Sequence, residues 1–273
     1  MKKRKNKKGI KMFFAKPGEY KPCGLFTTQH FELIAITIIG IVIALKNTVN
    51  KTKEEIRDII KRCTIIMWIL EIIMIAFKLS TGDVKNLNNY VPLYYCSLLL
   101  YAGILSSFCK GNLKRVGDIF LATGGIIGGL VFIILPTTSL PAYPMLHIVS
   151  LHSFFFHGTM IYLGLLMNIT NYIELHLSDI KYFSVLVGVV CLLAYIINKK
   201  FGSNLMFISQ NFSGMPIEII YNLTGKLYTL VMSVAQMTLP FYIVYFAKKT
   251  IYNSVRKKRG IENEKNIYSN TNV

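Results

Sequence analysis

Cys96 and His157 are the residues of this sequence best suited to nucleophilic chemistry. Cys96 lies in VPLYYCSLLL, where a long apolar run begins, and His157 lies in PMLHIVSLHSFFFHG, inside another apolar run. A thiol with a nearby histidine base is an activated nucleophile that forms a covalent intermediate. The two residues are far apart in the sequence, so their spacing does not show whether they meet. The pair is therefore a hypothesis that the fold must decide.

Cys96 differs in position from the other cysteines of the apolar runs. Cysteine in an apolar helix is ordinarily a small packing residue, which is our interpretation of Cys63, Cys109 and Cys191. If a helix begins just before Pro92, that proline falls in the first turn, where its missing N–H does no harm. Cys96 then follows one turn later on the same face. The cysteines form no CxxC pair, which argues against a disulfide framework or a zinc site.

The segment around His157 holds histidines at intervals of five residues, His147, His152 and His157. Five residues of an α-helix turn through about 140°, so the three side chains point in different directions. Two metal ligands on one helix need a spacing of three or four, so a metal site is not expected. Ser153, His157 and Gly164 belong to a narrow small-and-polar seam that should face the interior of a helix bundle.

Glu71 is an acidic residue in the middle of the apolar run CTIIMWILEIIMIAFKL. Ionisable groups at membrane depth are costly and mark functional sites by default. Two interpretations stay open. Glu71 is either a buried carboxyl satisfied by a neighbouring helix or a supporting residue of a functional site.

The composition indicates a membrane protein. Of 273 residues 53% are hydrophobic and 16% charged, and the mean hydropathy is +0.46. A soluble domain carries nearer a quarter of charged residues. A spanning helix needs roughly 17–25 mostly apolar residues. We therefore predict an all-α, polytopic bundle of about seven transmembrane helices, near 28–46, 62–80, 90–109, 116–136, 144–168, 182–200 and 227–247.

The net charge of +18 does not indicate nucleic acid. Lys and Arg gather in the tails and short loops, where anionic lipid headgroups attract them. We predict a basic N-terminal tail over residues 1–24, one transmembrane domain over 25–250, and a basic, polar C-terminal tail over 251–273. Between the spans, the loops on the C-terminal side carry more Lys and Arg, which favours a multi-pass cell-membrane protein oriented N-out and C-in. The basic N-terminal tail argues the other way.

Several stretches, in matching order, resemble one family of multi-span membrane proteins. The family includes the bacterial YwaF-type proteins and the eukaryotic transmembrane protein 164 acyltransferases. VPLYYCSLLL resembles its PLHLC element, and YPMLHIVSLHSFFFHG resembles its fifth helix with an FxxHG-like ending. FTTQHFELI, WILEII, GGIIGGLVFIILP and NKKFGSNLMFIS resemble further elements, and the resemblance covers about residues 25–250.

The resemblance implies a cysteine-dependent acyltransferase, which in the eukaryotic branch moves a fatty acyl chain from a phospholipid to a lysophospholipid. Its motif cysteine corresponds to Cys96 and its motif histidine to His157. The implied partners are membrane phospholipids and lysophospholipids, and no metal or soluble cofactor is needed. Counted from the helix starts, Cys96 lies about 8 Å deep and His157 about 18 Å deep. The two meet only if their helices are offset or tilted.

The remaining site residues would support that chemistry. Tyr94, Ser153 and Asn204 could stabilise a tetrahedral oxyanion, and Glu71 completes the predicted site. Two departures from the family pattern affect this group. Tyr94 replaces the histidine of PLHLC, and the N-Y-M element reads NLM from Asn204.

Two other classes of function stay open. A carrier or channel for a small solute or ion could line its pathway with Glu71, His157 and Gln236, since intramembrane polar groups often do so. Transporters usually show internal repeats and paired helices interrupted by Pro or Gly. This sequence shows no internal repeat and few such interruptions, which argues against a carrier. A structural or partner-binding membrane protein is the third class, for which a neutral replacement of His157 should be harmless.

Overall fold

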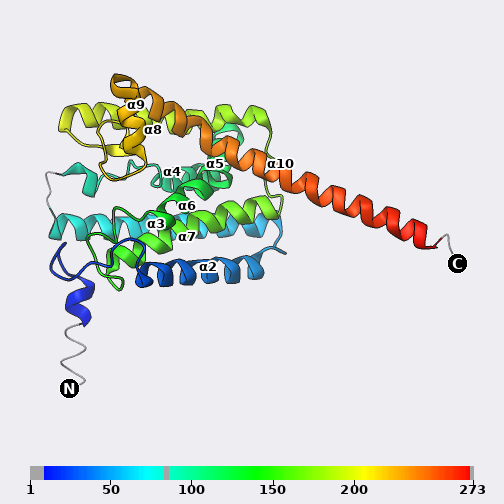
Figure 1. Cartoon of the computed structure of the whole chain (residues 1–273), viewed down its shortest axis with the longest axis horizontal. Coiled ribbons are helices and arrows are strands. Elements are labelled where there is room, and N and C mark those ends of the chain that lie inside the picture. The colour runs from blue at the N-terminus through cyan, green and yellow to red at the C-terminus, as the bar shows by residue number, and fades with distance from the viewer. Residues whose placement is uncertain (1–8, 83–85, 271–273) are drawn as a thin grey trace, which may run out of the picture.

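The structure is a computed structural model that describes residues 9–82 and 86–270. All regular elements in these ranges are helical, which confirms the predicted all-α class. Most helices run along the long axis of the molecule (Figure 1). The α-helices after a short N-terminal turn are α2 (Thr28–Thr48), α3 (Lys53–Thr81), α4 (Leu98–Phe108), α5 (Gly111–Ala122), α6 (Gly124–Ile134), α7 (Ile148–Ile169), α8 (Ile180–Phe201), α9 (Ile217–Thr224) and α10 (Tyr228–Asn270).

Short 3₁₀ turns connect several of these helices. They are η1 (Leu87–Asn89), η2 (Leu177–Asp179), η3 (Leu205–Phe207) and η4 (Gly225–Leu227). Two of the long helices begin at threonine caps. Thr27 accepts the His30 N–H at the start of α2, and Thr52 and Glu55 form a reciprocal capping box at the start of α3.

Six helical stretches of the described chain are long and apolar enough to cross a bilayer, and one shorter apolar helix accompanies them. The shorter helix is α4, with 11 residues and a length of about 16 Å against a hydrocarbon core of about 30 Å. The predicted span over 90–109 is thus not one continuous helix, which corrects the helix start that we expected near Pro92. The polytopic bundle itself is confirmed.

The helices form an inner group and an outer group. The α5–α6 stretch and α7 are mostly buried, whereas the spans of α2, α3, α8 and α10 bury only a third or less of their residues. In Figure 1, α2 and α7 lie on one side, α8 and α10 on the other, and α4 to α6 between them. Large exposed side chains such as Ile36, Ile69 and Leu192 therefore face the acyl chains of the bilayer.

In the described residues, hydrogen bonds and helix extend into both regions that we predicted as tails. Cys23 and Gly24 donate their N–H groups to Tyr143 and Leu140, each at 2.9 Å, so this segment packs over the loop between α6 and α7. The first residues of the N-terminal tail, 1–8, lie outside the described part. At the other end, α10 continues as a helix through Asn270 and projects beyond the bundle (Figure 1).

Candidate functional site

Cys96 lies in a turn that leads into α4. The Ser97 N–H donates to the Tyr94 carbonyl at 3.0 Å, and the Leu99 N–H donates to the Cys96 carbonyl at 3.1 Å. Helix α4 begins only at Leu98. Cys96 therefore precedes the helix. This corrects the prediction from the sequence, which placed Cys96 one turn inside the helix.

Two hydrogen bonds explain why the helix does not start at the proline. The Leu93 N–H donates to the Val91 carbonyl at 2.8 Å. The Tyr101 hydroxyl donates to the Pro92 carbonyl at 3.1 Å. These groups are thereby withdrawn from a helical pattern, and the residue before a proline is itself biased toward extended backbone.

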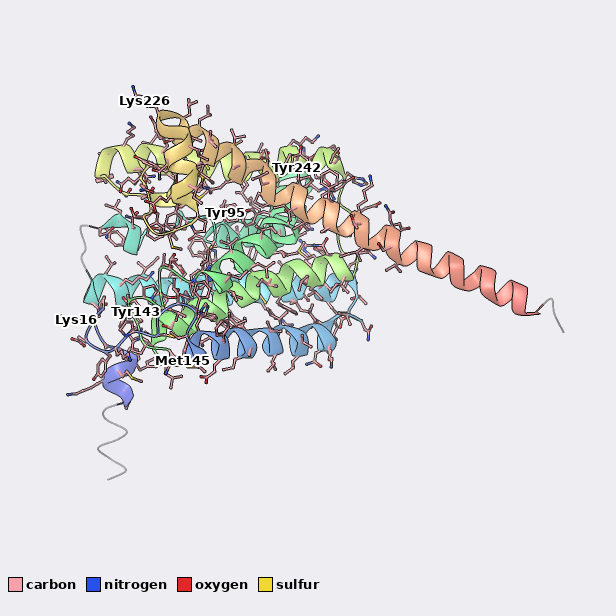
Figure 2. The ribbon with its side chains drawn as sticks, viewed as in Figure 1. Lys16, Tyr95, Tyr143, Met145, Lys226 and Tyr242 are labelled. Atoms are coloured by element: carbon pink, nitrogen blue, oxygen red, sulfur yellow. The ribbon has the colours of Figure 1, made fainter. Side chains whose placement is uncertain are left out.

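The glycine face of α6 makes room for this turn. The Cys96 Sγ lies 4.0 Å from the Gly128 carbonyl oxygen. A Cβ added at Gly128 would lie 3.0 Å from the Tyr95 ring, and one at Gly124 would lie 2.7 Å from the Tyr95 hydroxyl oxygen. Small residues at these two positions allow the ring to pack directly on the α6 backbone, between α6 and the α8–α10 layer (Figure 2).

His157 has one ring nitrogen engaged and the other unpaired. Its Nδ1 lies 2.6 Å from the Ser153 carbonyl oxygen. A carbonyl only accepts, so Nδ1 carries the proton and Nε2 carries the lone pair. Nε2 is buried and has no hydrogen-bond partner. The ring stacks on Phe132 of α6 with centroids 3.6 Å apart. His157 therefore presents an unprotonated nitrogen inside the bundle, in a fixed tautomer.

Cys96 and His157 lie against successive turns of α6. Cys96 approaches the Gly128 carbonyl, and His157 stacks on Phe132, four residues further along the same helix face. A Cβ at Gly129 would lie 2.8 Å from the His157 carbonyl oxygen, so α7 also approaches closely at this level. The contact points of Cys96 and His157 on α6 are therefore one helical turn apart, about 5.4 Å, which is less than the depth difference that we expected from the helix starts. Their pairing stays a prediction, because in the described residues no hydrogen bond joins them.

The supporting residues predicted from the sequence occupy different positions. Tyr94 packs its ring against Phe207, with centroids 5.2 Å apart. Ser153 contributes its carbonyl to His157. Asn204 closes a loop, because its Oδ1 accepts the N–H groups of residues 209 and 210 and its amide donates to the carbonyl of residue 210. The Asn204 side chain is thus engaged within its own loop.

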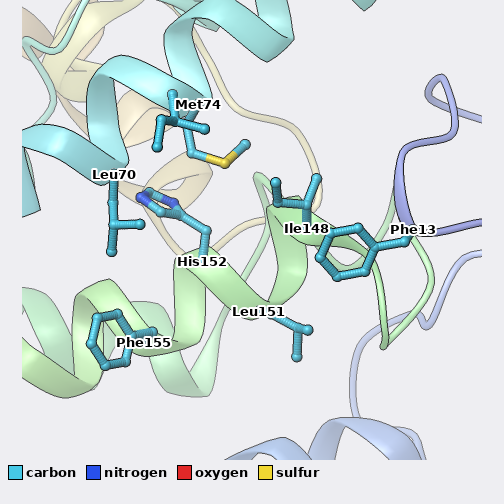
Figure 3. A pocket seen from close by; sticks show the side chains of 8 residues that line it. Phe13, Leu70, Met74, Ile148, Leu151, His152 and Phe155 are labelled. Atoms are coloured by element: carbon cyan, nitrogen blue, oxygen red, sulfur yellow. The ribbon is translucent and has the colours of Figure 1, made fainter. Parts of the chain in front are cut away.

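Glu71 faces His152 of α7. The Glu71 Oε2 lies 3.9 Å from the His152 Nε2. The His152 ring points toward α3 and lines an apolar groove of about 240 Å³ with Leu70, Met74 and Phe155 (Figure 3). The structure therefore brings Glu71 to a histidine of α7, but to His152 and not to the predicted His157.

The three histidines of the α7 segment point toward three different elements, as their spacing predicted. His147 bonds to Ala15 of the N-terminal segment, His152 faces α3, and His157 faces α6. Sequence reasoning missed Tyr95, whose hydroxyl is buried without a hydrogen-bond partner beside α6. The small residues spaced by four in GGIIGG signalled a close neighbour, although not which residue it would be.

Comparison with known proteins identifies a family. The model of the TMEM164 family matches residues 25–248, which is most of the chain. This match confirms the family resemblance seen in the sequence. No curated protein and no solved structure matches the chain.

Proposed function

The chain belongs to the TMEM164 family, and from this premise we propose that it is a membrane-embedded lipid acyltransferase with Cys96 as nucleophile and His157 as general base. One observation carries the proposal. The imidazole of His157 is held at Nδ1, so its unprotonated Nε2 is buried and has no partner among the described residues, and Cys96 and His157 lie against successive turns of α6.

In the first half-reaction, the Cys96 sulfur attacks the ester carbonyl of a phospholipid. The S–C bond forms, the thiol proton passes to Nε2 of His157, and the C–O ester bond breaks. His157 then returns the proton to the leaving alkoxide, which departs as a lysophospholipid. The acyl chain remains on the enzyme as a thioester. General acid–base help of this kind contributes about 10²–10⁴-fold.

In the second half-reaction, the hydroxyl of an acceptor lysophospholipid attacks the thioester. His157 takes the hydroxyl proton, the new ester bond forms, and the S–C bond breaks. The proton returns from His157 to the Cys96 sulfur, which restores the starting state. Tyr94 and Ser153 stay the proposed oxyanion donors, and Asn204 is a weaker candidate because its side chain is engaged in its own loop.

The surroundings of the pair favour transfer to a lipid over hydrolysis. The His157 ring lies between Phe132 and Phe156, and the Met160 side chain is fully buried beside Gly128. An apolar wall of this kind excludes water from a thioester intermediate. Phospholipids and lysophospholipids reach such a site from the bilayer itself.

The deciding experiment is intact-mass analysis of the purified protein after incubation with a phospholipid of one acyl composition. We expect an acyl-sized mass increment that hydroxylamine removes. Cys96→Ser should not acquire it, whereas Cys191→Ser, which changes another buried cysteine, should acquire it normally. An equal increment on Cys96→Ser would remove Cys96 from the mechanism.

The carrier alternative rests on a separate observation, the Glu71–His152 pair at membrane depth. It makes an opposite prediction in proteoliposomes. Solute or ion uptake that persists in Cys96→Ala and is lost in Glu71→Gln would favour a carrier over the acyltransferase.

A further inference from the structure

The loop of residues 203–210, here called the clasp loop, is held rigidly at the end of α8. The buried Asn198 makes four hydrogen bonds to it. Its Oδ1 accepts from the Leu205 N–H at 2.8 Å and the Ser203 hydroxyl at 2.7 Å, and its amide donates to the Leu205 carbonyl at 3.0 Å and the Ser209 hydroxyl at 2.8 Å. The side-chain amide of Asn198 therefore holds both ends of the clasp loop, since its oxygen accepts two hydrogen bonds and its nitrogen donates two.

The clasp loop also contains strained backbone. Met206 and Phe207 have φ values of 59° and 53°, in the left-handed region that non-glycine residues seldom adopt. Two side chains of α10 donate hydrogen bonds to the backbone carbonyls of Met206 and Phe207. Gln236 donates to the Met206 carbonyl at 2.8 Å, and the Tyr228 hydroxyl donates to the Phe207 carbonyl at 2.7 Å. Such strain persists only where the surrounding structure over-determines it, and it clusters at functional sites and clamps.

The clasp loop contacts the segment that carries Cys96 at two points. The Asn204 N–H donates to the Oδ1 of Asn88, in η1, at 2.9 Å. The Phe207 ring packs against the Tyr94 ring, two residues before Cys96, with centroids 5.2 Å apart. Phe207 of the clasp loop thus contacts the Cys96 turn at Tyr94, and α6 contacts the same turn at Tyr95.

We propose that the clasp loop is a positioning element for the Cys96 thiol, and that Asn88 is its positioning residue. Residues 91–97 lie outside a helix, so short turn hydrogen bonds hold their backbone in place of a continuous helical ladder. The two contacts from the clasp loop add a constraint from outside this turn. The catalytic consequence rests on the proposed function, but the positioning of the thiol does not.

The test measures the alkylation rate of Cys96 by N-ethylmaleimide in the full-length protein in phospholipid nanodiscs, without an acyl donor. Peptide mass spectrometry follows Cys96, with Cys109 of the same molecule as the internal reference. Asn88→Ala should speed Cys96 alkylation about three- to tenfold, the population change expected when one partly buried hydrogen bond is lost. Asn88→Asp, which keeps the acceptor oxygen, should restore the original rate.

Matched controls separate positioning from general loosening. Asn112 also accepts one side-chain hydrogen bond, from Tyr182 at 3.1 Å, and Asn112→Ala should leave the Cys96 rate unchanged. Phe207→Leu, which removes the ring contact, should raise the rate, whereas Phe201→Leu at the exposed end of α8 should not. An unchanged Cys96 rate in both Asn88→Ala and Phe207→Leu would overturn the proposal, as would an equal rise in Asn112→Ala.

The outcome is distinguishable from failure of the proposed function. If the wild-type protein never acquires an acyl group while Asn88→Ala still speeds Cys96 alkylation, the acyltransferase proposal fails and the positioning role stands. If acylation occurs and neither variant alters the alkylation rate, the reverse holds.

Discussion

The two ends of the histidine segment use the same side chain in opposite ways. His147 is fully buried and has both ring nitrogens paired. Nδ1 accepts the Val149 N–H at 3.1 Å, so Nε2 carries the proton and donates to the Ala15 carbonyl at 3.1 Å. His157 has the other tautomer, with Nδ1 protonated toward Ser153 and Nε2 unpaired. Both ring nitrogens of His147 are thus hydrogen-bonded, whereas His157 keeps the nitrogen to which the proposed mechanism assigns proton transfer.

The largest effect is expected from the unpaired histidine. His157→Gln should lower acyl transfer about 10²–10⁴-fold, because it removes the base while keeping an amide of similar length. The measurement is transfer of a labelled acyl chain from phospholipid to lysophospholipid in detergent micelles. His147→Asn serves as the control, since Asn is also a good N-cap. Acyl transfer that survives His157→Gln and is lost in His147→Asn would contradict the roles that we assign to the two histidines.

A smaller effect is expected at the surface of α6 that packs against Cys96 and His157. In Gly128→Ala, the new Cβ would lie 3.0 Å from the Tyr95 ring and 3.2 Å from the Met160 methyl group. Overpacking of this kind costs about 1–3 kcal/mol and should displace the Cys96 turn. We expect slower acylation of Cys96 by mass analysis. Gly40→Ala on α2, which meets open space, should match the wild type.

His147, whose two ring nitrogens are both hydrogen-bonded, should contribute to the stability of the fold and not to acyl transfer. His147→Ala leaves the buried Ala15 carbonyl and the Val149 N–H without partners, which costs about 1–3 kcal/mol. The thermal unfolding temperature should fall, while acyl transfer per folded molecule stays unchanged. A variant with unchanged stability would show that the N-terminal segment is not held by this bond.

The smallest effect concerns pH. Burial lowers the pKa of His147 below its ordinary value of 6.5, although the bond to the Ala15 carbonyl acts in the other direction. As the pH falls below about 6.5, the unfolded chain therefore binds a proton that the folded chain resists, and stability declines. The unfolding temperature of the wild type should drop more between pH 7 and pH 5 than that of His147→Asn. Parallel curves would exclude this contribution.

Much of the fold follows from sequence patterns that depend on the bilayer. Long apolar runs must be helical in lipid, where every backbone group needs an internal partner, and most of the predicted spans are long helices. The run over 90–109 was the error. It is as apolar as the others, but its Pro92 and the hydroxyl of Tyr101 divert the backbone hydrogen bonds, a competition that hydropathy does not register.

The sequence by itself determined the membrane class, the family, and the divergence of three histidines, because these depend only on composition, motif order and helix periodicity. The tertiary structure alone decided which histidine keeps an unpaired nitrogen and which partner Glu71 has. It also decided that Cys96 and His157 lie against successive turns of α6. These outcomes depend on the packing of neighbouring elements against one another, which no local pattern along the chain encodes.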